Sequence, residues 1–303
     1  NLLSHSTNHN QTSGNIVGCY QVSPLARFYI ANKLKLDPDT SKTLHRKASE
    51  IALEKDLVLV GARQSQAQKY LKETISYRSR EDAITGKLLK DALFLSRNNN
   101  YQAALEKIEV AKQLSPDFSE VFRVAGTIQY FAGNYFEANQ EYQTALEMCP
   151  DDPVLLFWYA GFLLRGEQDT KAAIEKLEKA KSLDPNSVPI DVELSRAYTF
   201  VKRFEESHDL LVPILEDDET SVKYTRICAD GFIQNFIRKI NFLIDSSLGR
   251  EALNVYLDSS EKLKKLPKRS YDRKVEERIK ELASKSYAIE NLVFTEKNLE
   301  NLK

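Results

Sequence analysis

From about residue 85 onwards, apolar residues recur about every three to four positions, with polar residues between them. This spacing places the apolar side chains on one face of a helix, so it predicts amphipathic α-helices. Strand-like alternation of apolar and polar residues is rare after about residue 35, and Gly and Pro are few. The pattern therefore predicts an all-α chain whose helices are joined by short turns.

The same order of residues returns at nearly constant intervals along the chain. The clearest copy is GNYFEANQEYQTALEMCPDD, residues 133–152. Its key positions recur 34 residues earlier and 35 residues later, and three of them recur after a further 34. A period near 34 residues marks a helix–turn–helix repeat. The four sets are Tyr101, Ala104, Ile108, Ala111 and Pro116; Tyr135, Ala138, Tyr142, Ala145 and Pro150; Thr170, Ala173, Leu177, Ala180 and Pro185; and Phe204, Leu211 and Ile214.

This periodic pattern resembles the tetratricopeptide repeat (TPR) family. Small residues at Gly126 and Ala138 let two helices cross closely, and Pro150 ends the second helix because it lacks an N–H. The resemblance implies a right-handed α-solenoid of helix–turn–helix TPR repeats over 85–118, 119–152, 153–187 and 188–218. The residues that carry it in the best copy are Phe122, Ala125, Gly126, Gly133, Tyr135, Ala138, Tyr142, Ala145 and Pro150.

Three copies depart from the family pattern. In the first copy, Asp91 and Ala92 stand at the positions of the small pair. In the third copy, the turn RGEQDTKAA leaves the register of the first helix open by one residue. In the fourth copy, Ser207 replaces the repeated Ala and Glu219 replaces the Pro.

The flanks of the repeats are also expected to be helical. Residues 219–303 are interpreted as a degenerate fifth helical pair with an elongated first helix, followed by one long polar helix from about residue 270 that caps the solenoid. Upstream, residues 37–84 are interpreted as linking helices or degenerate repeats, with helices over roughly 40–60 and 62–78.

The first 36 residues differ from the rest. A polar loop separates two short apolar pieces, and a helix is expected after Pro24, with Ser23 as its N-cap. A β-hairpin followed by a helix is similar to the end of the winged helix in STAND-class signal-transducing ATPases. The resemblance implies that the ATPase lies upstream, because no G-x-x-x-x-G-K-[ST] loop occurs in these 303 residues. The first residue is Asn1 and not Met, so we expect the chain to be a piece of a longer protein.

Composition narrows the classes of function. The net charge of −1 argues against a general binder of nucleic acid, which needs a basic excess. No apolar run reaches the roughly 18 residues of a transmembrane helix, and no secretory signal opens the chain. The three cysteines, Cys19, Cys149 and Cys228, are far apart and odd in number, which fits a cytoplasmic location.

No constellation of residues indicates catalysis, a metal or a cofactor. His5 and His9 share a polar loop without further ligands at metal-binding spacing, and His45 and His208 lie on expected helices without partners. Cys228 is interpreted as core filler. The basic run KLKKLPKRSYDRK, residues 262–274, is interpreted as solvated, with contact to nucleic acid or to an acidic partner as the alternative. We expect a protein that is not an enzyme.

In TPR proteins the first helices of successive pairs line a concave face, and the resemblance implies that a partner binds there. Aromatic and Arg side chains dominate such binding surfaces because they bury much area and make directional contacts. The alternative is that some of these side chains, Trp158 and Tyr159 above all, pack between helices. The candidate binding residues are Leu89, Leu93, Arg123, Tyr130, Phe131, Trp158, Tyr159, Phe162, Arg196 and Phe200.

These observations favour a non-catalytic module that binds a protein or a peptide. Leu89, Leu93 and Val124 stand where one TPR subfamily grips a C-terminal carboxylate, so that kind of clamp is not expected. The first hypothesis is the sensor and scaffold region of a larger bacterial STAND-like NTPase, with a defence role as an analogy. The alternatives are a stand-alone TPR adaptor and a transcriptional regulator with a winged helix. Self-association stays open, and neither membrane nor nucleic acid is expected as a partner.

Overall fold

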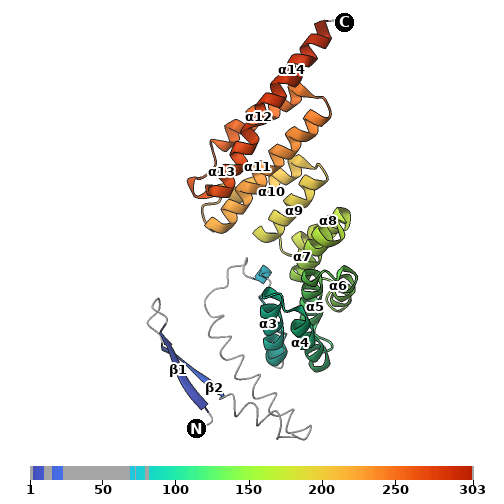
Figure 1. Cartoon of the computed structure of the whole chain (residues 1–303), viewed down its shortest axis with the longest axis vertical. Coiled ribbons are helices and arrows are strands. Elements are labelled where there is room, and N and C mark those ends of the chain that lie inside the picture. Colours follow the sequence, from blue (N-terminus) through green and yellow to red (C-terminus); the bar gives the residue numbers. More distant parts are fainter. Residues whose placement is uncertain (1–2, 10–15, 23–68, 72, 79–81, 302–303) are drawn as a thin grey trace.

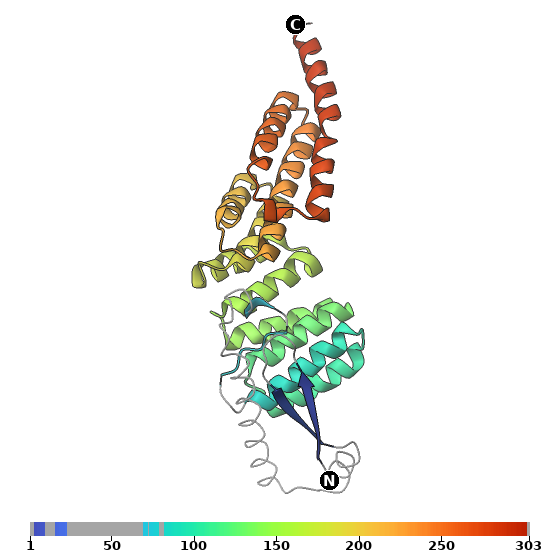
Figure 2. The same ribbon diagram turned by 90° about the vertical axis from the view of Figure 1, so that its left-hand side faces the viewer.

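The computed structural model describes residues 3–9, 16–22, 69–71, 73–78 and 82–301. Ten helices pair in sequence order and stack into an elongated solenoid (Figures 1 and 2), as the sequence pattern predicts. The pairs are α3 (Ala83–Arg97) with α4 (Tyr101–Leu114), α5 (Ser119–Ala132) with α6 (Tyr135–Met148), α7 (Pro153–Phe162) with α8 (Thr170–Leu183), α9 (Val188–Phe200) with α10 (Phe204–Glu216), and α11 (Val222–Asp245) with α12 (Gly249–Leu263).

The repeated small residues lie where the helices of a pair cross. Ala104, Ala138 and Ala173 are all fully buried in equivalent places, at 0% exposure. A Cβ atom on Gly126 would lie 2.9 Å from the ring of Tyr142, so this crossing of α5 and α6 needs glycine. The first helices also touch their successors, α3 with α5, α5 with α7, and α9 with α11. We call the side of the solenoid formed by α3, α5, α7, α9 and α11 the first-helix face.

A π-helical turn accounts for the longer third repeat. The turn, η3 (Leu163–Glu167), extends α7, and Gln168 follows it in the left-handed conformation with φ of 58°. A π-turn accommodates one residue more than an α-turn. The extra residue is therefore absorbed at the end of the first helix, and α8 begins in register with the other second helices.

Local capping fixes where several helices begin and end. Asp152 accepts hydrogen bonds from the backbone N–H groups of Val154 and Leu155, with Pro153 at the first helical position. Asn100 and Asp169 cap α4 and α8 in the same manner. Gly133 ends α5 with φ of 87°, a conformation that a residue with a side chain rarely adopts.

The C-terminal flank differs from the expected single polar helix. The chain forms α13 (Arg273–Ala283) and α14 (Ser286–Asn301), with a break at Ser284 and Lys285. The break lets α13 pack on α11 and α14 pack on α12. Val275, Leu282 and Ile289 are all buried in one core. A short 3-10 turn, η4 (Lys268–Ser270), precedes α13.

The N-terminal flank is described only in part. Strands β1 (Leu3–His9) and β2 (Ile16–Val22) pair antiparallel, with Leu3 opposite Val22. The helix expected after Pro24 and the helix expected over 40–60 lie outside the described residues, and nothing further supports the winged-helix resemblance.

The helix expected over 62–78 is wrong at its end. Residues 73–78 are not helical, and residues 69–71 form only a 3-10 turn and a bend. The reason is packing. Tyr70 and Ile75 are both buried against the solenoid, whereas residues five apart on a helix point in different directions.

Candidate protein-binding face

A non-helical stretch of the chain lies on the first-helix face. It comprises residues 69–71 and 73–78, and we call it the docked segment (Figure 1, the cyan fragment near α3 and α7). It contacts α3, α5, α7 and the turn between α8 and α9. Its two buried apolar side chains are those of Tyr70 and Ile75, which are 4% and 6% exposed.

The Tyr70 end of the docked segment makes the most directional contacts. The Tyr70 hydroxyl donates to Oδ2 of Asp184 at 2.5 Å, and the ring meets Phe157 edge-on with 5.1 Å between centroids. Lys69 Nζ lies 2.7 Å from the same carboxylate oxygen. Burial and the bond to Asp184 raise the pKa of Tyr70. The pKa of Asp184 is lowered although partial burial opposes this, because Lys69 and Tyr70 donate to the ionised carboxylate.

The middle of the docked segment is held through its backbone and one aliphatic side chain. Nη2 of Arg123 donates to the carbonyl oxygen of Thr74 at 3.0 Å. Arg123 is itself buried in an ion pair with Glu120 at 2.7 Å, so its guanidinium is fixed in position. Ile75 packs into the core between α3 and α5. A surface ion pair joins Glu73 to Arg97 at the end of α3.

The other end of the docked segment lies over the start of α3. A Cβ atom on Gly86 would meet the Tyr77 ring at 2.1 Å, so glycine at this position makes room for the tyrosine. Arg78 binds Asp82 at 3.0 Å and Asp117 at 3.1 Å. The segment therefore crosses the first-helix face from the start of α3 to the turn that precedes α9.

An aromatic pocket of about 310 Å³ adjoins Tyr70 on the same face. Phe131 is 45% exposed at its edge, and Tyr130 packs edge-on against Phe162 at 5.7 Å. The indole N–H of Trp158 is buried and has no hydrogen-bond partner in the described part of the chain. The pocket thus offers mainly apolar area. Its lining also includes Tyr70, Thr127, Tyr142, Phe157, Gly161, Arg165 and Glu193.

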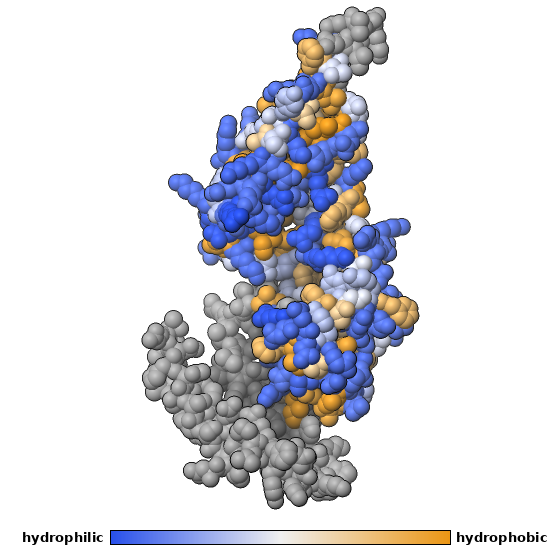
Figure 3. All heavy atoms as spheres, viewed as in Figure 1, coloured by the Kyte–Doolittle hydropathy of each residue, from blue (hydrophilic) through white to orange (hydrophobic). Residues whose placement is uncertain are grey.

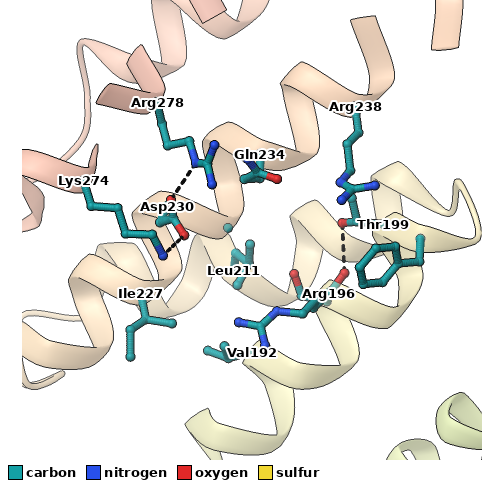
Figure 4. A pocket seen from close by; sticks show the side chains of 13 residues that line it. Val192, Arg196, Thr199, Leu211, Ile227, Asp230, Gln234, Arg238, Lys274 and Arg278 are labelled. Atoms are coloured by element: carbon teal, nitrogen blue, oxygen red, sulfur yellow. Dashed lines mark hydrogen bonds and ion pairs between the residues drawn. The ribbon is translucent and has the colours of Figure 1, made fainter. Parts of the chain in front are cut away.

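A second, polar pocket of about 250 Å³ continues along α9 towards α11 and α13 (Figure 4). Asp230 is held between Lys274 at 2.6 Å and Arg278 at 3.1 Å. Across the pocket, the guanidinium of Arg238 stacks on Phe200 at 4.6 Å. In the space-filling view, apolar side chains form several separate patches along this side of the molecule (Figure 3).

The structure divides the ten candidate binding residues into two groups. Tyr130, Phe131, Trp158, Arg196 and Phe200 are wholly or partly accessible on the first-helix face, and their role in binding stays a prediction. The other five are buried, and the expectation that their side chains are free to meet a partner is corrected. These five are Leu89, Leu93, Arg123, Tyr159 and Phe162.

Each buried candidate has an internal partner. Leu89 and Leu93 pack in the same core as Ile75, and Arg123 is paired with Glu120. Tyr159 stacks on Tyr142 at 5.4 Å and donates to Asn139 at 2.7 Å. Phe162 stacks on Tyr142 at 5.5 Å and reaches the aromatic pocket only as part of its wall.

Sequence reasoning missed Tyr70, Phe157 and Asp184. Tyr70 and Asp184 are 114 residues apart, and no periodic pattern links a position outside the repeats to one within them. Phe157 precedes the predicted Trp158, and the open register of the third repeat hid it. The pair Glu120 and Arg123, three apart on a helix, was an available sign that this arginine is used internally.

His208 and Cys228, which the sequence analysis weighed as candidates for catalysis or metal binding, pack against other parts of the protein. His208 lies against Phe232, with 5.1 Å between ring centroids, and Lys262 Nζ is 3.2 Å from its Nε2 atom. Cys228 is fully buried, and burial raises the pKa of its thiol to about 12. In the described part of the chain no group of acidic, His and Cys side chains could hold a metal ion, and no helix could cross a bilayer.

The basic run over 262–274 is largely paired with carboxylates. Lys262 lies 3.0 Å from Asp258, and Arg269 lies 2.8 Å from Asp218. At its end Lys274 holds Asp230 in the wall of the polar pocket. These pairs offset part of the positive charge of the run.

Comparison with known proteins shows no family membership for the chain. No protein-family pattern and no curated protein matches the chain. Among solved structures, it is similar to PilF of Pseudomonas aeruginosa (15% identity, TM-score 0.44, 58% of this chain and 90% of that one). It is also similar to a thermophilic TPR protein of Thermus thermophilus (17%, 0.42, 66% and 97%) and to YrrB, a TPR protein with an unusual peptide-binding site (17%, 0.41, 55% and 84%). At these values the functional argument rests on the geometry of this chain.

Proposed function

We propose that the chain is a non-catalytic scaffold, without a cofactor, whose first-helix face binds an extended segment of a partner protein. The observation that carries the proposal is the docked segment. Here the face accepts a non-helical stretch of polypeptide, buries an aromatic and an aliphatic side chain from it, and bonds to its backbone carbonyl. The contacts are those by which a separate peptide is recognised.

The exposed aromatic side chains extend this face beyond the docked segment. Phe131 and Phe200 are 45% and 47% exposed, and Trp158 lines the aromatic pocket. Exposed aromatic groups beside a concave pocket are the usual anchors of protein interfaces. We expect the partner to cover Phe131 and to place an apolar side chain in the aromatic pocket.

A site-specific photo-crosslinker tests this proposal in cells that contain the natural partner. We expect p-benzoylphenylalanine at Phe131 to form a covalent adduct with one predominant protein, identified by mass spectrometry. The matched control is the same crosslinker at Phe136, which is 70% exposed on the second helix α6. Equal adducts at the two positions, or none at Phe131, would contradict the proposal.

The finer proposal is that these repeats are the sensor of a longer, bacterial STAND-like NTPase. It rests on the resemblance of the first 36 residues, of which the structure describes the paired strands β1 and β2. A stand-alone adaptor is the alternative. Sequencing the gene upstream of Asn1 separates them, because the NTPase requires a phosphate-binding loop there.

A further inference from the structure

We propose that the docked segment occupies the binding position of the partner, so that the partner replaces it with an extended peptide carrying an aromatic residue at the place of Tyr70. This inference rests on the proposed function and deepens it by naming the chemistry of the partner and its competitor. The partner's aromatic ring would pack on Phe157, with a hydroxyl donating to Asp184. Five residues further on, an aliphatic side chain would take the place of Ile75.

Every contact of the docked segment described above is one that a separate chain could make. Tyr70 and Ile75 insert side chains, Thr74 offers its carbonyl, and Glu73 faces Arg97. The solenoid side of these contacts is fixed independently of the segment. Arg123 is held by Glu120 within α5, and Phe157 packs against Trp158 within α7. The binding positions therefore persist when the segment leaves.

The docked segment leaves part of the site unused. Tyr70 lines the aromatic pocket but leaves about 310 Å³ of it open, beside Phe131 and Trp158. Leu71, the next residue, is 38% exposed, so its side chain stays outside the pocket. A partner that fills the pocket as well as the Tyr70 position gains contacts that the segment lacks.

The docked segment competes with a partner because it is tethered close to the site. Arg78 lies only five positions before the start of α3 at Ala83, so the segment is always present at a high effective concentration. A tethered segment of this kind excludes ligands that bind weakly, but a partner that makes more contacts displaces it. The face is thereby selective for a partner with the aromatic group at the Tyr70 position and a further apolar group for the open pocket.

The test uses the full chain and a fluorescent peptide of its own residues 68–78, QKYLKETISYR. In the variant Tyr70→Ala plus Ile75→Ala, the segment loses both buried anchors. We expect the peptide to bind this variant at least about tenfold more tightly than the wild-type chain by fluorescence anisotropy, because the tethered competitor is removed. A peptide with Ala at both anchor positions should bind neither chain, and adding Asp184→Ala to the variant should weaken the binding of the intact peptide.

Two controls keep the outcome decisive. Leu71→Ala changes an exposed side chain of the segment and should bind the peptide as the wild type does. If the double variant loses its helical circular dichroism signal, Tyr70→Phe replaces it, because this change removes only the hydroxyl that bonds Asp184 and should still favour the peptide over wild type.

The results also separate this inference from the proposed function. A folded variant that binds the peptide no better than wild type overturns the idea of an internal occupant. If the Phe131 adduct still forms in that case, the scaffold function stands and its partner binds elsewhere on the face. If the peptide binds the variant but no Phe131 adduct forms, the docked segment remains an internal occupant of the site, and the proposal of an external partner is overturned.

Discussion

At the scale of single residues, Tyr142 shows how the repeat is closed. Its ring is buried between Tyr159 and Phe162, and its hydroxyl lies 2.9 Å from that of Thr127. Burial raises the pKa of this phenol to about 12. The ring has no room to move away from α5, and the small residue opposite it, Gly126, is the one that lets the two helices meet.

Gly126→Ala is therefore expected to destabilise the protein by about 1–3 kcal/mol, although alanine is the better helix former. The added methyl would lie 2.9 Å from a rigid, buried ring. The control is Gly231→Ala in α11, where the nearest atom to the new methyl is Leu211 Cδ1 at 3.5 Å. The control should be neutral or slightly stabilising in urea unfolding; equal losses in both would show that the ring contact does not matter.

The positions of residues that define the repeat could be predicted from the sequence, whereas the accessibility of the candidate binding residues could not. Ala104, Ala138 and Gly126 were correctly assigned to the helix crossings, because only small side chains fit there. Arg123 was assigned to the binding face from helical periodicity, yet it is buried. Periodicity gives the direction of a side chain, but it does not show that another part of the chain covers it.

At the scale of elements, a network of buried hydroxyl and amide groups joins α9, α10 and α11. Ser207, which replaces the repeated Ala, lies 2.9 Å from the Ser195 hydroxyl and 2.8 Å from that of Thr199. Thr199 also lies 3.1 Å from the side-chain oxygen of Asn235, whose amide donates to the carbonyl of Phe204 at 2.8 Å. The Ser207 hydroxyl thus finds both partners on α9, and Asn235 extends the network to α11.

Asn235→Leu should cost about 1–3 kcal/mol of unfolding free energy, because it removes the buried hydrogen bonds of Asn235 to the Thr199 hydroxyl and the Phe204 carbonyl. Asn254→Leu on α12 is the matched control, since Asn254 is exposed. The control should change stability by less than about 0.5 kcal/mol. Thermal and urea unfolding measure both, and a neutral Asn235→Leu would mean that the network contributes no net stability.

Element boundaries could be predicted only where a local signal marks them. Asp152 and Pro153 start α7 as capping rules require, and Gly133 ends α5. The extra residue of the third repeat was visible in the spacing. A longer turn and a π-turn give the same spacing, so the sequence left the register open until the structure placed the residue at Leu163–Glu167.

At the scale of the whole molecule, each pair of helices packs on the pairs next to it in the stack. Such a solenoid needs a cover at its end, and α14 provides it by packing on α12. Ile289 of α14 is fully buried, and a Cβ atom on Gly249 of α12 would lie 2.9 Å from Leu292. The two ends of the solenoid share few contacts, so a change at one end should stay local.

Ile289→Asp should raise amide hydrogen exchange in α12 and the end of α11 and leave α5 and α6 unchanged. A buried charge without a partner disfavours the docking of α14, whereas distant pairs keep their own contacts. Tyr287→Asp, at a position 74% exposed on the same helix, is the control and should change nothing. Faster exchange throughout α5 and α6 would show that the solenoid unfolds as one unit.

The whole-molecule features divide in the same way. The all-helical solenoid could be predicted from the sequence, because its pattern of residues recurs in four copies. The docked segment could not be predicted, because its contacts, Tyr70 with Asp184 and Thr74 with Arg123, occur once and join distant parts of the sequence. Among the buried candidates, Arg123 bonds to this segment, whereas Tyr159 and Phe162 are buried by contacts within the repeats.

The docked segment also has a mechanical consequence. It runs from the start of α3 to Asp184 and so ties together three helical pairs that otherwise touch only in succession. A tie across several units limits how far the arc of the solenoid can bend. When a ligand takes its place, the span between α3 and α9 becomes a property of that ligand, and the distance between labels on these two helices would report which chain is bound.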